Sequence, residues 1–170
     1  DDSVVDTLIQ NIERDHGHID VLVNNAGLET STAFAVEDER EIRTVSRVNL
    51  EVPLLLTRHV LPGMLNRNVG HLVFVSSLAG TAGFPGMSVY GASKAATRSF
   101  NEALGREARR SGVRVIDARP PHTETGLASR AIAGTPPKFP TGLDPVQVAR
   151  RIVQAIADGE TDLSSGAFTP

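Results

Sequence analysis

Cysteine is absent from the sequence, and its absence excludes several kinds of chemistry at once. Disulfide bonds, thiolate nucleophiles and cysteine-based zinc sites all need a residue that this chain does not have. A chain without disulfides is compatible with an intracellular home, and we expect a cytoplasmic protein.

Long apolar runs are missing as well. No stretch approaches the roughly twenty apolar residues that a membrane-spanning helix needs, so we expect no membrane partner. No basic start followed by an apolar core marks a secretion signal. The sequence also has no internal repeat and no low-complexity tract.

A strong charge of either sign is the third absence. The net charge is −3, which gives no electrostatic reason to expect a nucleic acid as a partner. Arg106, Arg109 and Arg110 form a cationic cluster, but they lie near the carboxyl end of a predicted helix, where arginine is favourable.

What the chain does contain is sufficient for one globular domain. It has 170 residues, of which 40% are hydrophobic and 22% charged, so it can bury a core. It opens with Asp1 and Asp2 rather than with methionine, and we expect that it is a fragment of a longer chain.

Short apolar runs alternate with amphipathic stretches. The apolar runs predict buried strands at residues 21–23, 72–75 and 113–118, and a short fourth strand around residues 161–163. Helical periodicity predicts helices over residues 2–15, 36–66, 88–111 and 145–158. Strands that alternate with helices pair in parallel through right-handed crossovers, so the sequence predicts an α/β fold with a parallel sheet.

The stretch from His71 to Lys94 carries the candidate chemistry. Its predicted strand delivers Ser76 and Ser77 to the carboxyl end of the sheet, where open α/β folds bind their ligands. Tyr90 and Lys94 follow at a spacing of four, which places both on one face of a helix. We therefore expect Ser77, Tyr90 and Lys94 to meet at the strand end.

These groups suit proton transfer at a carbonyl or an alcohol. A tyrosine hydroxyl has a pKa of about 10, and an ammonium one turn away should lower it, which makes Tyr90 a candidate general acid and base. Ser77 could hold and polarise the substrate oxygen. The alternative is that a tyrosine and a lysine four residues apart arise by chance, with Tyr90 only at a helix start.

Pro53 interrupts the long helix predicted over residues 36–66. In α-helical geometry its missing N–H deprives the carbonyl of Asn49 of a partner, which leaves that carbonyl free for water. The alternative is a packing kink. Pro62 and Gly63 predict a bend or an end near residue 62.

Four motifs occur in the order found in one known family. DVLVNNAG ends at Gly27, VNL surrounds Asn49, VSSLAG contains Ser77, and YGASK runs from Tyr90 to Lys94. Through these motifs the chain resembles the short-chain dehydrogenase/reductase family, whose domains are Rossmann-type. The resemblance implies a doubly wound parallel α/β sheet, of which residues 1–170 are the C-terminal portion.

The resemblance also implies the roles of several residues. The implied catalytic residues are Asn49, Ser77, Tyr90 and Lys94. Ser77 and Tyr90 would meet a small-molecule carbonyl or alcohol, and the Asn49 carbonyl would bind a relay water. The residues implied to contact the cofactor, NAD or NADP, are Asn24, Tyr90, Lys94, Thr123 and Thr125. When complete, the protein would be a homo-oligomer, either a dimer or a tetramer.

Two departures from the family pattern limit this analogy. Pro121 stands where the family has glycine, which removes an N–H near the expected nicotinamide site. The glycine-rich phosphate loop is also missing, because in the family it lies ahead of the region matched here. Gly80, Gly83 and Gly86 are spaced differently from that loop and belong to the connection between Ser77 and Tyr90.

Two other functions stay open from the sequence. Extended sugar-nucleotide epimerases and dehydratases share the tyrosine–lysine spacing, and a truncated, non-catalytic module could keep the motifs. His16 and His18 lack further ligands, so we expect no metal site. His122 is a candidate for the border of the substrate cleft, but residues 128–144 contain nothing that identifies a substrate.

Overall fold

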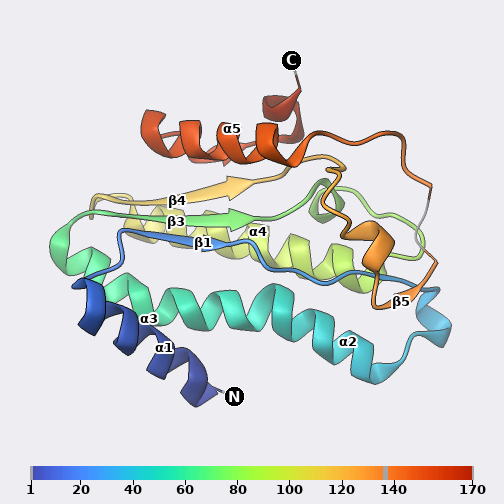
Figure 1. The fold of residues 1–170 in the computed structure, drawn as a ribbon, viewed down its shortest axis with the longest axis horizontal. Helices are drawn as coiled ribbons and strands as arrows, with labels where there is room; N and C mark the ends of the chain where they lie inside the picture. Colours follow the sequence, from blue (N-terminus) through green and yellow to red (C-terminus); the bar gives the residue numbers. More distant parts are fainter. Residues whose placement is uncertain (1, 136–137, 170) are drawn as a thin grey trace.

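The computed structural model describes residues 2–135 and 138–169, which form a parallel sheet with helices on both faces (Figure 1). The sheet order is β1 (Val21–Asn24), β3 (Gly70–Val75), β4 (Val113–Ala118) and β6 (Asp162–Leu163). All three pairings are parallel. The α/β fold, the parallel sheet and the short fourth strand are therefore confirmed.

Two hydrophobic cores flank this sheet because successive strand residues point to opposite faces. Leu72 and Phe74 belong to a core on the side of α1 (Asp2–His16), α3 (Val52–Arg67) and α4 (Ser88–Ala108). Val73 and Ile116 belong to a second core beneath α5 (Pro145–Asp158). Figure 1 shows α5 on one side of the sheet and α1 and α3 on the other, so the sheet is doubly wound.

One strand is less buried than the sequence predicts. The strand over residues 21–23 was expected to be buried, but Val21 is 41% and Val23 50% exposed. The reason is that β1 lies at the end of the sheet order. Among the residues described, the helix that covers this face, α5, packs on β3, β4 and β6 and not on β1. In the described part of the chain β1 pairs on one side, with β3.

The single helix predicted over residues 36–66 is divided in the structure into a short 3-10 turn and three successive helical elements. A 3-10 turn, η1 (Phe34–Val36), precedes α2 (Glu39–Ser46), which begins where the Asp38 side chain accepts a hydrogen bond from the backbone N–H of Arg40. A π-helical turn, η2 (Arg47–Glu51), then leads into α3.

The sequence predicted a bend or an end near Pro62. The helix does not end there, because α3 continues through Pro62 to Arg67. The carbonyl that Pro62 deprives of a partner belongs to Arg58, which is exposed and can meet water. Buried Val60 and Met64 meanwhile hold the helix against the sheet. Packing therefore outweighs the local propensity.

A second, two-stranded sheet was not predicted. β2 (Thr30–Ser31) pairs in parallel with β5 (Ala133–Gly134), which ties the segment after β1 to the segment after η4 (Ala128–Arg130). Gly134 has a φ of +80°, and a Cβ there would overlap the Ser31 carbonyl oxygen, so this pairing requires glycine. Strands of two residues leave no periodic signal in a sequence.

Candidate active site

The carboxyl end of β3 presents Ser77 through a short turn. Ser77 begins the 3-10 helix η3 (Leu78–Gly80), and its Oγ accepts a hydrogen bond from the N–H of Ala79 at 3.1 Å. η3 packs directly on α4, since a Cβ at Gly80 would lie 2.8 Å from the backbone carbonyl carbon of Lys94. Gly80 is therefore explained by this close approach of two backbones.

Tyr90 and Lys94 lie on the inward face of α4, as their spacing predicts. They are 5% and 6% exposed. The Nζ atom of Lys94 donates to the Val75 carbonyl at 2.9 Å and lies 5.7 Å from the centroid of the Tyr90 ring. The helix thus places both side chains at the end of the strand that carries Ser77.

The pKa of Tyr90 moves opposite to the predicted direction. Burial raises it to about 12; the hydrogen bond with Ser77 acts downward and the charge of Glu29 acts upward. Burial also lowers the pKa of Lys94 to about 8, which the charge of Asp117 opposes. The prediction fails because desolvation of both groups dominates, and because the ammonium of Lys94 is directed at the Val75 carbonyl.

The Asn49 side chain connects the π-helical turn to the segment after β1. It accepts from the N–H of Leu28 and donates to the carbonyl of Leu28, both at 2.8 Å, and its Nδ2 also donates to Ser93 Oγ at 3.1 Å. Asn49 is therefore fixed by three hydrogen bonds inside the protein.

The expectation of a free Asn49 carbonyl is corrected by the helix register. The N–H of Val52 bonds the carbonyl of Arg47, five residues back, so in this register the missing N–H of Pro53 falls opposite Val48. The Asn49 carbonyl instead accepts a long, 3.4 Å hydrogen bond from Thr97 Oγ1.

Gly27 is where the predicted groups approach one another. A Cβ at this position would lie 3.5 Å from Asn49 Oδ1 and 3.7 Å from Lys94 Nζ. Asn49 and Lys94 therefore converge at the carboxyl ends of β1 and β3. The structure in this way brings the predicted residues Asn49, Ser77, Tyr90 and Lys94 to one edge of the sheet.

The other predicted cofactor residues are placed differently. Both amide atoms of Asn24, at the end of β1, are buried and have no hydrogen-bond partner within the described residues. Thr123 and Thr125 serve the local turn: Thr123 Oγ1 donates to the Pro121 carbonyl at 2.9 Å, and Thr125 Oγ1 accepts from the N–H of Leu127 at 3.4 Å. Among the described residues, neither threonine side chain hydrogen-bonds to Tyr90 or Lys94.

Two residues near Tyr90, Phe139 and Glu29, were not assigned from the sequence as site residues, whereas His122 was a candidate for the border of the substrate cleft. Phe139 packs against Tyr90 and stacks on the ring of His122, with 4.7 Å between centroids. Glu29 is buried, burial raises its pKa, and its charge raises the pKa of Tyr90. A carboxylate two residues after Gly27 is a signal that could have identified Glu29, whereas the loop around Phe139 carries none.

Within residues 2–135 and 138–169, no group of three or more histidine and acidic side chains could hold a metal ion. His16 and His18 are both exposed. In the same part of the chain, no helix is both long and apolar enough to cross a bilayer.

The doubly wound sheet, with polar groups gathered at its carboxyl edge, defines the Rossmann class of α/β fold. Residues 1–135 match the model of the short chain dehydrogenase family. The chain belongs to that family.

Particular relatives agree with this assignment. The chain is 32% identical over 175 residues to a dehydrogenase/reductase SDR family member 7B from Danio rerio, covering 99% of this chain and 57% of that protein. A short-chain dehydrogenase from Streptomyces avermitilis superposes with a TM-score of 0.86 at 30% identity, covering 98% of this chain and 68% of that one. A short-chain dehydrogenase from Sphingobium yanoikuyae in complex with NADPH gives 0.84 at 25% identity, covering 96% and 62%. The chain thus spans a little over half the length of the Danio rerio relative.

Proposed function

We propose that this protein is an oxidoreductase that transfers hydride between a nicotinamide dinucleotide, NAD or NADP, and the carbonyl or alcohol carbon of a small molecule. The observation that carries the proposal is the placement of Tyr90 and Lys94 on one buried helix face beside Ser77. Membership of the short chain dehydrogenase family and the NADPH bound by the Sphingobium yanoikuyae relative support it.

Each residue of the proposed catalytic set has a separate task. Ser77 holds the substrate oxygen, and Tyr90 exchanges a proton with it. Because burial raises the pKa of Tyr90 to about 12, the phenol is protonated at neutral pH and is ready to act as the acid in carbonyl reduction. Lys94 holds its charge near the ring, and Asn49 keeps the segment after β1 in place.

The residues at the sheet edge fit a nicotinamide dinucleotide. The two amide atoms of Asn24 have no hydrogen-bond partner within the described residues, and because a buried polar group without a partner is costly, a cofactor hydroxyl would be a favourable partner for them. Gly27 leaves room beside Asn49 and Lys94. We propose that Asn24 and Lys94 contact the two ribose groups, with Thr123 and Thr125 near the nicotinamide. When bound, the reduced cofactor would supply the hydride, and the oxidised cofactor, whose nicotinamide ring carries a positive charge, would accept it.

We further propose that residues 1–170 are the C-terminal portion of a Rossmann-type domain and have no activity alone. In the family a βαβαβ segment with the glycine-rich phosphate loop precedes the counterpart of α1. Without it the pyrophosphate lacks its anchor, and the exposed apolar residues Val21 and Val23 favour aggregation. The chain should therefore bind either cofactor weakly.

The test is an assay for hydride transfer with NADH and NADPH against a panel of small carbonyl compounds. It uses the chain alone, and the chain preceded by the βαβαβ segment of the Streptomyces avermitilis relative. We expect turnover of at least one carbonyl compound by the extended protein only. Lys94→Ala should damage both turnover and cofactor affinity, because its proposed role is double. Absence of turnover across the panel, despite tight cofactor binding, would favour a non-catalytic module.

The proposal also covers assembly and location. We propose a cytoplasmic homo-oligomer, a dimer or a tetramer, and small residues on α4 such as Ala92 and Ala96 would allow close helix packing. Light scattering of the extended protein measures the oligomeric state. A monomer at assay concentration would contradict this part of the proposal.

A further inference from the structure

Asp117 is a buried carboxylate in a strand whose other buried residues are apolar. It belongs to β4, faces α4 beside Phe74 of β3, and is buried. A carboxylate in such a place is costly unless several partners compensate it. The neighbours of Asp117 therefore indicate what holds this charge inside the domain.

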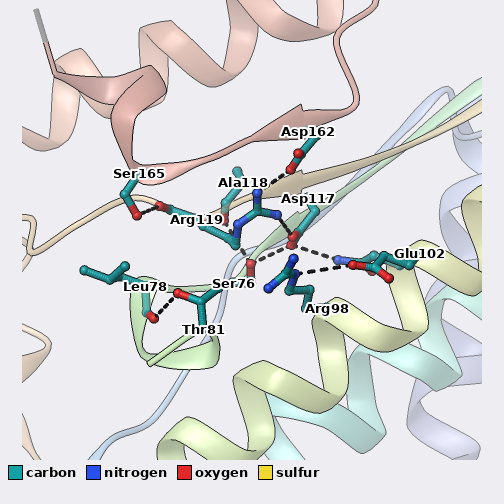
Figure 2. A network of polar contacts seen from close by, with 11 residues as sticks. Ser76, Leu78, Thr81, Arg98, Glu102, Asp117, Ala118, Arg119, Asp162 and Ser165 are labelled. Atoms are coloured by element: carbon teal, nitrogen blue, oxygen red, sulfur yellow. Dashed lines mark hydrogen bonds and ion pairs between the residues drawn. The ribbon is translucent and has the colours of Figure 1, made fainter. Parts of the chain in front are cut away.

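Asp117 has three partners from three segments, and Figure 2 labels two of them, Ser76 and Arg119. Ser76 donates to its Oδ1 at 2.6 Å, Asn101 of α4 donates to the same oxygen at 3.1 Å, and the guanidinium of Arg119 pairs with the other oxygen. The second arm of Arg119 pairs with Asp162 of β6. One carboxylate thus connects the end of β3 with α4, β4 and, through Arg119, β6.

This network borders the candidate active site. Ser76 is the residue before Ser77, and it follows Val75, whose carbonyl accepts the hydrogen bond from Lys94 at 2.9 Å. Asn101 lies two turns after Lys94 on the same helix. The carboxylate of Asp117 and the ammonium of Lys94 therefore hold adjacent residues of one strand end.

We propose that Asp117 is a positioning residue for the reaction proposed above. It fixes Ser76, and with it the strand end that carries Val75 and Ser77, and it supplies the negative charge that balances the buried ammonium of Lys94. The first part concerns geometry and the second concerns charge. Only the link to catalysis rests on the proposed function.

The charges around Lys94 support this assignment. Burial lowers the pKa of Lys94, and Asp117 is the charge that raises it. Of the other charged groups on the surrounding elements, Arg98 pairs with Glu102 on α4 at 3.4 Å, and the charge of Glu29 acts on Tyr90. Arg119 pairs with both Asp117 and Asp162, so one positive charge faces two negative charges. The group therefore keeps a net negative charge, which favours the ammonium of Lys94.

The test reads the pKa of Lys94 directly, by nuclear magnetic resonance titration of the lysine side chains in the 170-residue chain. The chain has two lysines, Lys94 and the exposed Lys138, so assignment needs one variant. In Asp117→Asn the pKa of Lys94 should fall by about half a unit to one unit, because the charge that favours the ammonium is gone. Glu160→Gln, which breaks the paired contacts of Arg151 at 2.9 and 2.6 Å, is the matched control and should leave it unchanged.

Asp162→Asn keeps the measurement informative if Asp117→Asn does not fold. The Asp162 side chain is 72% exposed, so the fold should tolerate the change. Arg119 then loses its second partner and neutralises Asp117 more fully, so the pKa of Lys94 should again fall, by less. If Lys94 titrates as in the unmodified chain in whichever of these variants fold, the network is only a structural tie and the proposal is wrong.

A second readout links the charge to the reaction. In the extended protein, Asp117→Asn should shift the pH profile of kcat to lower pH, because the pKa of Lys94 falls. Glu160→Gln should leave the profile unchanged. An unchanged profile contradicts the positioning role. Failure of the proposed function itself is recognised separately, because an enzyme that transfers no hydride has no profile, whereas the titration of Lys94 needs neither cofactor nor substrate.

Discussion

The Nζ atom of Lys94 lies 5.7 Å from the centroid of the Tyr90 ring, yet its hydrogen bond goes to the Val75 carbonyl. The pair is therefore held together by burial and by the strand end, rather than by a direct bond between ammonium and phenol. This arrangement keeps a neutral tyrosine beside a cation in a desolvated place, and it has measurable consequences.

Tyr90 is the sole tyrosine of the chain, and there is no tryptophan, so its ionisation can be followed by tyrosinate absorbance alone. We expect a midpoint at a pH of about 12, where an ordinary phenol has 10.0. Glu29→Gln should lower the midpoint, because it removes an anion, and Ser77→Ala should raise it. Circular dichroism in parallel confirms that the chain is still folded. A midpoint near 10 in the folded chain would refute the desolvated site.

The stability of the chain should depend on pH through Lys94. Its pKa is lowered from 10.5 to about 8 in the folded state, so the buried ammonium lowers the stability of the fold below pH 8. This cost disappears as the pH rises from 8 to 10.5, where lysine becomes neutral in both the folded and the unfolded state. The midpoint of urea unfolding should thus rise between pH 8 and 10.5, with a change of at most about 3 kcal/mol in the free energy of unfolding. Lys94→Met should abolish this rise. An equal rise in that variant would assign it to another group.

Gly80 and Gly83 offer a matched pair of substitutions in one loop. A Cβ at Gly80 would lie 2.8 Å from backbone atoms of Lys94, whereas a Cβ at Gly83 meets nothing within 4 Å. Gly80→Ala should therefore push η3 from α4 and destabilise the chain by about 1–3 kcal/mol. Gly83→Ala should be nearly neutral. Thermal unfolding of both variants checks this, and equal effects would contradict the tight contact.

Pro53 tests the role of the π-helical turn. Pro53→Ala restores an N–H that can re-form regular α-helical pairing, which would shift Asn49 away from Leu28 and Ser93. In the extended protein, activity should fall although helix propensity rises. A variant that is more stable and equally active would show that the proline only packs.

The features predicted from the sequence are those with a periodic or a spaced signal. The apolar run at β3 and the spacing of Tyr90 and Lys94 were sufficient to predict a strand end and a helix face that meet. Helical periodicity also predicted the bounds of α5, residues 145–158, whereas α4 ends at Ala108, three residues before the predicted end at residue 111.

The features that the sequence could not provide depend on tertiary contacts. The helix register at Pro53 is set by a π-helical turn, which no local pattern distinguishes from an α-helix. The pKa direction of Tyr90 depends on burial by Phe139, Met87 and Ala79, of which Phe139 comes from a distant loop. Asp117 could have been noticed as a carboxylate beside the apolar residues Val115 and Ile116, but its partners Ser76, Asn101 and Arg119 become visible only once the chain is folded.

The most direct test of the central claim is the turnover of Tyr90→Phe in the extended protein, measured beside its affinity for NADH and NADPH. This change removes the hydroxyl and keeps the ring that packs against Phe139. Turnover should fall by about 10² to 10⁴-fold while cofactor affinity stays nearly unchanged, since the lost group acts on the proton of the substrate oxygen. Near-normal turnover in Tyr90→Phe would contradict the account.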